Sequence, residues 1–227
     1  MVEIGAGLGS LTVALADAGA EVLAVEFDRM LVPALAEVVG DRPNVRILHA
    51  DAMKHDWEAE LGAGPWLLVA NLPYNLATPL VLDVLEGVPA IVRIVVMVQR
   101  EVGERLVAPP GSTAYGAPSV RAAARARVAL VRLVPPEVFW PRPSVESVVV
   151  RLDRIEPEVD VEDPRLWRVI EAGFAQRRKT MRNALRRLGL DAAEADRALR
   201  DAGLEPGVRA EELGIDRFAA IAAALPA

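Results

Sequence analysis

The 227-residue chain is 52% hydrophobic, which is enough for one large domain or for one domain with a small appendage. It has no cysteine and only two histidines, which excludes disulfides, thiolate nucleophiles and cysteine-ligated zinc, and we expect no metal site. No apolar run reaches the roughly 18 residues of a membrane helix and no secretory signal is visible, so we expect a cytoplasmic protein without membrane contact.

The net charge of −6 conceals one basic block. Residues 1–60 carry 4 basic and 11 acidic side chains, whereas residues 165–187 carry 8 and 1. Most of the positive charge is arginine, whose planar guanidinium suits phosphate recognition. The charge distribution therefore leaves nucleic-acid binding open despite the acidic total.

Short apolar runs alternate with amphipathic segments along the first part of the chain. Strands are predicted at residues 2–4, 21–25, 45–48, 66–70 and 92–98, and helices at 11–18, 29–39 and 79–85. This alternation predicts an α/β fold with a mostly parallel sheet, whose ligands bind at the carboxyl ends of the strands. β-Branched segments at 127–134 and 147–152 are expected to form an antiparallel edge.

An acidic, proline-bounded linker is predicted at residues 155–164, and the pattern after it is helical only. The expected helices cover residues 164–174, 179–188, 192–202 and 211–225, with Gly189 and Gly203 at helix C-termini. We therefore expect two domains, residues 1–157 and a small helical domain at 158–227.

A glycine-rich turn follows the first predicted strand and includes Gly5, Gly7 and Gly9. Glycine permits a positive φ and close backbone approach, and the following helix offers free N–H groups to an anionic part of a ligand. A dinucleotide fingerprint would require glycine at position 10, where Ser10 stands, and this disfavours a nicotinamide oxidoreductase. A purely structural turn is the alternative.

An acidic residue stands at or soon after the end of each of the next two predicted strands. Glu26 lies 21 residues after Gly5, where a carboxylate can accept both ribose hydroxyls of a nucleoside. Asp51 follows the third strand and can accept a hydrogen bond from an adenine amine. A solvated acid for Glu26 and a helix cap for Asp51 are the structural alternatives.

The tetrapeptide Asn71-Leu72-Pro73-Tyr74 follows the fourth strand and suits activation of an aromatic amine. Asn71 Oδ1 and a backbone carbonyl can accept the amine hydrogens, which aims the nitrogen lone pair at a methyl group. Pro73 fixes φ and removes a competing donor, and Tyr74 offers a stacking face. A tight polar turn is the alternative.

The proline-rich loop at residues 135–143 holds Phe139, the candidate for a second stacking face. Farther along, one segment is rich in cations and is expected to begin a helix on which Arg178, Arg182 and Arg186 share a face. The alternative for Phe139 is an aromatic side chain buried within its loop. The alternative for the basic segment is a helix face that is merely solvated. The RNA-binding candidates in this segment are Arg177, Arg178, Lys179, Arg182 and Arg186.

Together these motifs resemble the bacterial ribosomal RNA small-subunit adenine dimethyltransferases, with the erythromycin-resistance large-subunit methyltransferases as relatives. The resemblance runs from Met1 to about Leu225 and rests on seven stretches of sequence. These are residues 2–9 (VEIGAGLG), 25–28 (VEFD), 71–75 (NLPYN), 97–102 (MVQREV), 114–116 (AYG), 138–145 (VFWPRPSV) and 176–180 (QRRKT). The last stretch and the tyrosine-glycine loop favour the small-subunit enzymes.

The resemblance implies a class I S-adenosylmethionine-dependent methyltransferase with a Rossmann-like, seven-stranded sheet and a helical rRNA-contacting domain. It implies that Gly5, Glu26, Asp51 and Asn71 contact the methyl donor or the target, and the glycine turn adds Gly7. The implied substrate is two adjacent adenosines in a hairpin loop near the 3′ end of small-subunit rRNA, each methylated twice. The implied partner is the pre-30S particle, bound by a monomer.

One departure concerns the donor site. The family carries a stretch before the first strand that closes over the donor, whereas Met1 here falls inside that strand. We therefore expect weak donor binding by this chain, and calorimetry showing micromolar or tighter affinity would contradict this. A large-subunit rRNA adenine methyltransferase and a non-catalytic ribosome-assembly factor stay as alternatives.

Overall fold

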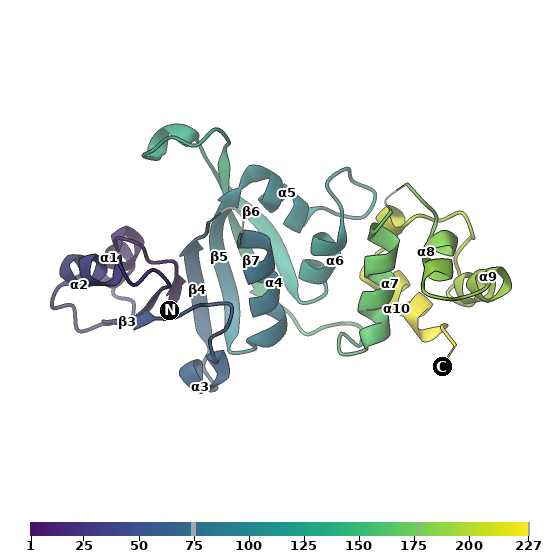
Figure 1. Ribbon diagram of the computed structural model, residues 1–227, viewed down its shortest axis with the longest axis horizontal. Coiled ribbons are helices and arrows are strands. Elements are labelled where there is room, and N and C mark those ends of the chain that lie inside the picture. The colour runs from purple at the N-terminus through teal and green to yellow at the C-terminus, as the bar shows by residue number, and fades with distance from the viewer. Residues whose placement is uncertain (74–75, 177, 227) are drawn as a thin grey trace. The chain divides into compact units, whose positions relative to one another are not determined.

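The structure is a computed structural model that describes residues 1–73, 76–176 and 178–226, and the chain divides into two compact units (Figure 1). The first unit comprises Met1–Gly103 and Ala126–Arg154, and the second comprises Glu104–Arg125 and Ile155–Ala227. The sequence-based division at residue 157 differs from this, because it leaves residues 104–125 in the first part.

The first unit is built on a seven-stranded sheet in the order β3-β2-β1-β4-β5-β7-β6. β1 to β5 are parallel, whereas β7 pairs antiparallel with β5 and β6. This confirms the predicted α/β fold and its antiparallel edge. The strands are β1 (Val2–Ile4), β2 (Val22–Glu26), β3 (Val45–His49), β4 (Trp66–Asn71), β5 (Ile91–Gln99), β6 (Ala126–Val134) and β7 (Ser147–Arg154).

Burial explains which apolar runs became central strands. All five residues of β2 are buried, as are all three of β1, because helices or neighbouring strands cover both faces. β6 lies at the edge of the sheet and leaves Leu130, Val131 and Leu133 exposed. The exposed apolar side chains of this unit thus include a group on its antiparallel edge.

Strand register places the loop between β6 and β7 at the carboxyl edge of the parallel sheet. Asn71, the last residue of β4, pairs with Met97 near the end of β5. Gln99 at the end of β5 pairs with Ser147, which also pairs with Val134 at the end of β6. Loops that follow β1 to β4 and the β6–β7 loop therefore emerge at one edge, where α/β proteins bind ligands.

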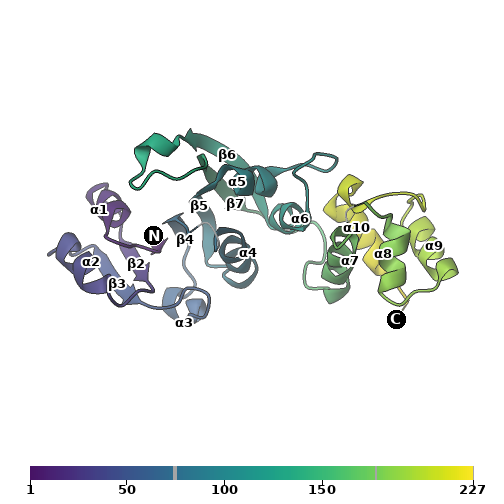
Figure 2. The same ribbon diagram turned by 45° about the horizontal axis from the view of Figure 1, so that its top comes forward.

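Helices α1 (Ser10–Asp17) and α2 (Val32–Val39) lie beside β2 and β3 (Figures 1 and 2). Leu35 and Val39 of α2 are buried in one core cluster with Val22 and Ala24 of β2. α4 (Ala77–Gly87) packs on β5 through buried residues that include Leu80, Val81, Val84 and Leu85. The first unit also contains the short α3 (Trp57–Leu61) and the 3-10 helix η1 (Pro136–Val138).

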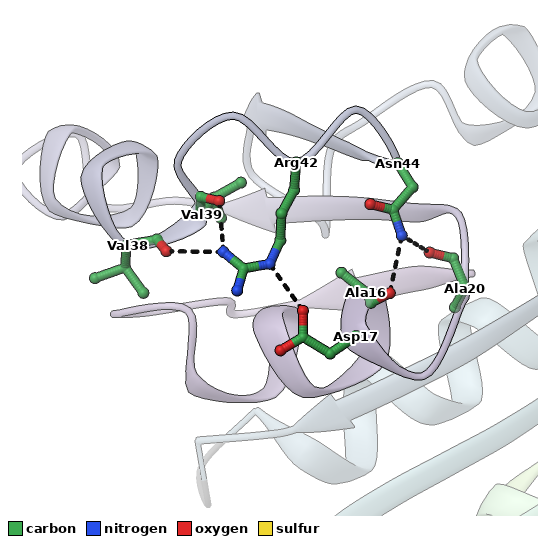
Figure 3. Close-up of polar contacts among 7 residues, drawn as sticks. All are labelled: Ala16, Asp17, Ala20, Val38, Val39, Arg42 and Asn44. Carbon is green, nitrogen blue, oxygen red and sulfur yellow. Dashed lines mark hydrogen bonds and ion pairs between the residues drawn. The ribbon is translucent and has the colours of Figure 1, made fainter.

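Two side chains beside β3 fasten the ends of α1 and α2 (Figure 3). Arg42 donates from Nε to Asp17 Oδ1 at 3.0 Å and from Nη1 to the carbonyl of Val39 at 2.8 Å. Asn44 Nδ2 donates to the carbonyls of Ala16 and Ala20 at 3.0 and 2.8 Å. These bonds tie the segment before β3 to the C-terminal ends of α1 and α2 and add donors at the carbonyls of Ala16 and Val39.

Arg154, the last residue of β7, satisfies the C-terminal end of α4 in the same way. Its guanidinium donates to the carbonyls of Val84, Leu85, Val88 and Ile91 at 3.2, 2.8, 3.0 and 2.9 Å. A cation at a helix C-terminus also interacts favourably with the helix dipole. One side chain therefore joins the antiparallel edge of the sheet to α4 and to the start of β5.

The second unit is helical around its own core. Phe218, Leu185, Leu199 and Ile170 are among its fully buried side chains. Its helices are α6 (Ala117–Ala123), α7 (Pro164–Phe174), α8 (Met181–Arg187), α9 (Ala192–Asp201), the 3-10 helix η2 (Ala210–Glu212) and α10 (Ile215–Ala223). α5 (Arg100–Val107) has residues in both units. No helix in the described part of the chain is long and apolar enough to cross a membrane.

Residues 104–125 belong with the helical unit because of contacts made far along the chain. The buried hydroxyl of Tyr115 donates to the carbonyl of Leu213 at 2.6 Å, and its ring packs edge-on against Phe174. Gly111 N donates to the carbonyl of Glu211 at 2.7 Å. Burial raises the pKa of Tyr115 to about 12, so its hydroxyl stays protonated and remains a donor.

The helix ends differ from the predictions at identifiable residues. The helix expected at 211–225 begins only at Ile215, because residues 210–212 form a 3-10 turn and Gly214 is the N-cap. The prediction of Gly189 and Gly203 just after two helices is confirmed, with φ values of 105° and 69°.

Candidate active site

The glycine turn joins β1 to α1 through residues with positive φ. Gly5, Gly7 and Gly9 have φ values of 75°, 57° and 83°. Gly9 also leaves no room for a side chain, since a Cβ there would lie 2.9 Å from Leu35 Cδ1. The backbone therefore requires glycine at the start of α1 for conformation and for packing against α2.

Glu26 ends β2 with its carboxylate held by two backbone amides. Oε2 accepts from Gly7 N at 2.7 Å and Oε1 accepts from Asp28 N at 2.8 Å, and the residue is 7% exposed. Each oxygen keeps a lone pair beyond its single amide partner. Gly7 thus positions the carboxylate, a role that the sequence pattern did not distinguish from ligand contact.

Asp51 stands in a turn after β3. Its Oδ1 accepts from Met53 N at 3.0 Å, and Lys54 Nζ lies 3.5 Å from Oδ2. The side chain is 31% exposed and is available to a ligand. Asp51 does not cap a helix, because α3 begins only at Trp57 with Asp56 as its N-cap.

The tetrapeptide begins at the last residue of β4. Asn71 is exposed, whereas Leu72 is 2% exposed and donates from its N to the carbonyl of Met97 at 3.3 Å. Tyr74, the predicted stacking face, lies outside the described residues. The sheet therefore anchors Leu72 and leaves the side chain of Asn71 at its edge.

A cavity of about 410 Å³ at this edge brings together five of the predicted residues, Gly5, Glu26, Asp51, Leu72 and Pro73. Of the other described candidates in this unit, Gly7, Asn71 and Phe139 are not part of its wall. Gly7 reaches it through its bond to Glu26, and Asn71 adjoins Leu72 in the chain. The remaining wall residues are Ile4, Val25, Phe27, Ala50, Ala52, Met53, Leu76 and Leu80.

Phe27, Met53 and Leu76 are wall residues that the sequence motifs missed. All three are large apolar side chains with substantial exposure, and Phe27 is 69% exposed. Phe27 and Met53 flank the two carboxylates, since they follow Glu26 and Asp51 closely in the chain. For Phe27 the available signal was an apolar residue directly after the acid that ends a strand; Met53 and Leu76 carry no such signal.

Phe139 is half-buried and follows the short 3-10 helix η1. Its N donates to the carbonyl of Pro136 at 3.2 Å, and an ion pair between Glu137 and Arg142 closes the loop. The loop emerges at the same edge as the cavity, in the same unit.

The basic segment of the second unit is organised differently from the prediction. Helix α8 begins at Met181, after Thr180 in extended conformation, so Arg178 and Lys179 precede it. The expectation that Arg178 shares a helix face with Arg182 and Arg186 is therefore wrong. The backbone of Thr180 and Met181 is instead committed to residues near Arg209, through a bridge and a 2.8 Å bond from Met181 N to the carbonyl of Val208.

The cations of this segment fall into two kinds. Arg182 pairs with Asp196 of α9, with Nε 2.6 Å from Oδ1 and Nη2 3.0 Å from Oδ2. Arg178, Lys179 and Arg186 are exposed. Arg177 lies outside the described residues.

Comparison with known proteins places these features in a family. Residues 1–225 match the family described as ribosomal RNA adenine dimethylase. Ribosomal RNA small subunit methyltransferase A of Kineococcus radiotolerans is 46% identical, over 100% of this chain and 76% of that protein. The protein of the same name from Acidothermus cellulolyticus is 45% identical, over 99% of this chain and 79% of that protein.

Two solved structures share the fold at low sequence identity. A dimethyladenosine transferase from Plasmodium falciparum has a TM-score of 0.77 at 21% identity, covering 97% of this chain and 87% of that one. The 23S rRNA methyltransferase ErmE has a TM-score of 0.72 at 24% identity, covering 99% and 89%.

Proposed function

The chain belongs to the ribosomal RNA adenine dimethylase family, and from that premise we propose that it dimethylates N6 of two adjacent adenosines in small-subunit rRNA. The adenosines lie in a hairpin loop near the 3′ end of the 16S rRNA, and the methyl donor is S-adenosylmethionine. The observation that carries the proposal is the cavity in which Gly5, Glu26, Asp51, Leu72 and Pro73 meet beside Asn71.

The residues of this cavity fit S-adenosylmethionine. Glu26 has a spare lone pair on each oxygen for the two ribose hydroxyls, and Asp51 can accept from the adenine amine. Phe27 and Met53 supply apolar surface for the flat base between these carboxylates. When bound, the donor supplies an electrophilic methyl group on a cationic sulfonium.

The residues after β4 prepare the accepting amine. An aromatic amine is a weak nucleophile because its lone pair is delocalised into the ring. Asn71 Oδ1 and a backbone carbonyl of the tetrapeptide accept the N–H groups and hold the nitrogen pyramidal. Tyr74 and Phe139 stack on the target base, and Pro73 contributes no competing donor. No general base acts before transfer, since the product ammonium loses its proton afterwards.

The exposed cations of the second unit are the proposed rRNA contacts. Arg178, Lys179 and Arg186 are placed to neutralise phosphates, and Arg177 belongs to the same run. Arg182 contributes less directly, because Asp196 already holds its guanidinium. The partner is the pre-30S particle in the cytoplasm, and the enzyme acts as a monomer.

A methylation assay with tritiated donor tests this proposal. The 227-residue protein should label purified small subunits and not large subunits. Asn71→Ala should lower the rate by about 100-fold or more, since a mispositioned amine loses its alignment. The affinity of Asn71→Ala for small subunits should change little. The control Val92→Ala, at the amino end of β5, should leave the methylation rate and the small-subunit affinity unchanged.

Each contrary result favours a particular alternative. Labelling of large subunits alone would indicate a large-subunit methyltransferase. Tight binding to small subunits without labelling, in the parent protein as in Asn71→Ala, would indicate a non-catalytic assembly factor.

A further inference from the structure

Trp140 is 98% exposed, more than any other large hydrophobic side chain described in the chain. An indole ring carries 150–250 Å² of mostly apolar surface, so leaving it in water forgoes a large gain from burial. Neighbouring Val138 is 64% exposed. Exposed apolar groups that lie together commonly mark a site of interaction.

The loop that carries Trp140 is stiffened on both sides of the ring. Four prolines occur within residues 135–143. The helix η1 precedes Phe139, and the Glu137–Arg142 ion pair spans Trp140. A ring held on a stiff loop loses little conformational freedom when a partner binds it.

Phe139 and Trp140 face different surroundings although they are adjacent. Phe139 has extended backbone angles (φ −105°, ψ 149°), and in extended chain successive side chains point to opposite sides. Accordingly Phe139 is half-buried while Trp140 is in solvent. One base therefore cannot stack on both rings in this conformation, and Trp140 needs a second flat group.

The position of the loop indicates what that group is. The loop leaves β6 and returns to β7 at the carboxyl edge of the sheet, the edge of the donor cavity, and Figure 1 shows it projecting beyond the strands. A substrate whose reacting base enters at this edge brings neighbouring nucleotides to the loop. Unpaired bases are flat and available for stacking, whereas paired bases are not.

The β6–β7 hairpin is less acidic than the rest of the first unit. Residues 126–154 carry five arginines against three acidic side chains, whereas residues 1–103 carry six basic against fourteen acidic. At the loop itself Arg142 pairs with Glu137, and Arg127, Arg151 and Arg154 lie at the other end of the hairpin, so charge lowers the repulsion of a polyanion without attracting it to the loop.

We propose that Trp140 is a stacking platform for an unpaired RNA base that flanks the target adenosine, separate from the residues that hold the target itself. This inference rests on the proposed rRNA substrate. On this inference Trp140 contributes to RNA affinity and to the preference for an unpaired loop over a duplex. It takes no part in methyl transfer.

Fluorescence with two RNA probes tests the proposal. The first probe is a synthetic hairpin with two adjacent adenosines in its loop, and the second is a fully paired duplex of the same length. The hairpin should quench tryptophan emission, because a base stacked on an exposed indole quenches it, and the duplex should not. Trp140→Phe should remove this quenching, since Trp57 is buried and Trp66 and Trp167 are partly buried.

Binding and kinetics supply a second readout. Trp140→Ala should weaken hairpin binding by about 5- to 100-fold, the range expected for one base on one aromatic ring, while Trp140→Phe stays within a few-fold of the parent. The value of kcat at saturating hairpin and the affinity for S-adenosylhomocysteine should not change. Val92→Ala is the matched control, because Val92 is a 40% exposed apolar residue at the opposite edge of the sheet.

Several outcomes would overturn the inference. The inference fails if Trp140→Ala binds the hairpin as tightly as the parent protein does. It also fails if Trp140→Ala loses as much affinity for the duplex as for the hairpin. Light scattering that shows the parent self-associating, and Trp140→Ala not, would assign the ring to a contact between copies of this chain. If the parent binds and labels small subunits while Trp140→Ala matches it, only this inference fails. If the parent does neither, the proposed function fails with it.

Discussion

At the scale of single residues, Glu3 in β1, just before the glycine turn, is a carboxyl group that is buried at a cost in free energy. It is 1% exposed, and its Oε2 has no hydrogen-bond partner among the described residues. Burial raises the pKa of the Glu3 carboxyl above its usual value; the Thr12 hydroxyl opposes this in part, and the negative charge of Glu26 adds a smaller increase. The ionised form is therefore disfavoured by folding.

Replacing this carboxyl should stabilise the protein at neutral pH. Since the folded-state pKa is the higher one, the stability associated with Glu3 is complete below the unfolded pKa and is lost as pH rises through the folded pKa. Glu3→Gln should raise the free energy of unfolding at pH 7 by on the order of 1 kcal/mol, with little effect near pH 4. Urea unfolding at both pH values measures this, with the exposed Glu37→Gln as control. A less stable Glu3→Gln at pH 7 would show that the charge itself is needed.

The sequence predicted the polar part of the candidate site better than its walls. Strand ends and residue chemistry pointed to Glu26 and Asp51, because parallel strands bring their carboxyl ends together. Nothing in the local sequence distinguished Gly7, whose amide holds Glu26, from a ligand contact. Leu80 joins the cavity from the first turn of α4, and apolar periodicity alone does not reveal that this turn lies beside the strand ends.

At the scale of elements, the end of α4 depends on a residue 67 positions after its own last residue. Four carbonyls, from the end of α4, the turn after it and the first residue of β5, converge on the Arg154 guanidinium. These contacts are partly buried, so water would have to enter the site before it could take the place of the Arg154 guanidinium as the donor to each carbonyl. The helix carries Leu80 into the cavity wall, so its position matters to the site.

Removal of the Arg154 side chain should lower the stability of the protein more than removal of the Arg151 side chain on the same strand. Arg154→Ala should lower the free energy of unfolding by about 2–4 kcal/mol, because several carbonyls lose a charged donor together. Arg151→Ala, which breaks an exposed ion pair with Asp153, should cost less than about 1 kcal/mol. Chemical denaturation of both variants provides the comparison. Equal losses would mean that solvent satisfies the end of α4.

The parallel strands and most helices were predictable, whereas three short helices were not. The five parallel strands were recognised from apolar runs, whereas α3, α5 and α6 are absent from the sequence-based predictions. These helices have five to eight residues, and over so short a span their apolar residues were not recognised as helical, although α1, α2 and α8 of similar length were predicted. α5 also contains Gly103, and glycine lowers helix propensity. A Cβ at this position would lie 2.3 Å from Val148 Cγ1, so glycine allows the helix to pack closely on β7.

At the scale of the whole molecule, opposite charges are segregated along the chain. The acidic residues 1–60 contribute to the cavity proposed to hold the donor, whereas the basic block lies in the helical unit. A total charge of −6 therefore says little about RNA affinity, which depends on the cations that remain exposed.

The salt dependence of binding should separate exposed cations from the paired one. Arg178→Ala, Lys179→Ala and Arg186→Ala should each weaken binding to small subunits and lower the slope of log affinity against log salt by about 0.7 to 0.9. Arg182→Ala should instead lower thermal stability, because Asp196 loses its partner. Affinities measured over a series of KCl concentrations test this. An unchanged slope in all three exposed variants would place the phosphate contacts elsewhere.

The extent of the two units was the least predictable feature. Composition indicated a helical C-terminal part, but the assignment of residues 104–125 to it depends on pairs such as Tyr115 with Leu213. Those two residues are 98 positions apart, and the sequence around each of them does not indicate that they are in contact.

The hydrogen bond from Tyr115 to Leu213 also constrains how the protein can be made. A nascent chain that has emerged only as far as β7 holds α6 and Tyr115 without the helices that bury them. The core of the helical unit combines residues 104–125 with residues near the end of the chain, so its assembly waits until synthesis is almost complete. A fragment that starts at Ile155 would lack one wall of its core, and an expression design for this unit must supply residues 104–125 as well.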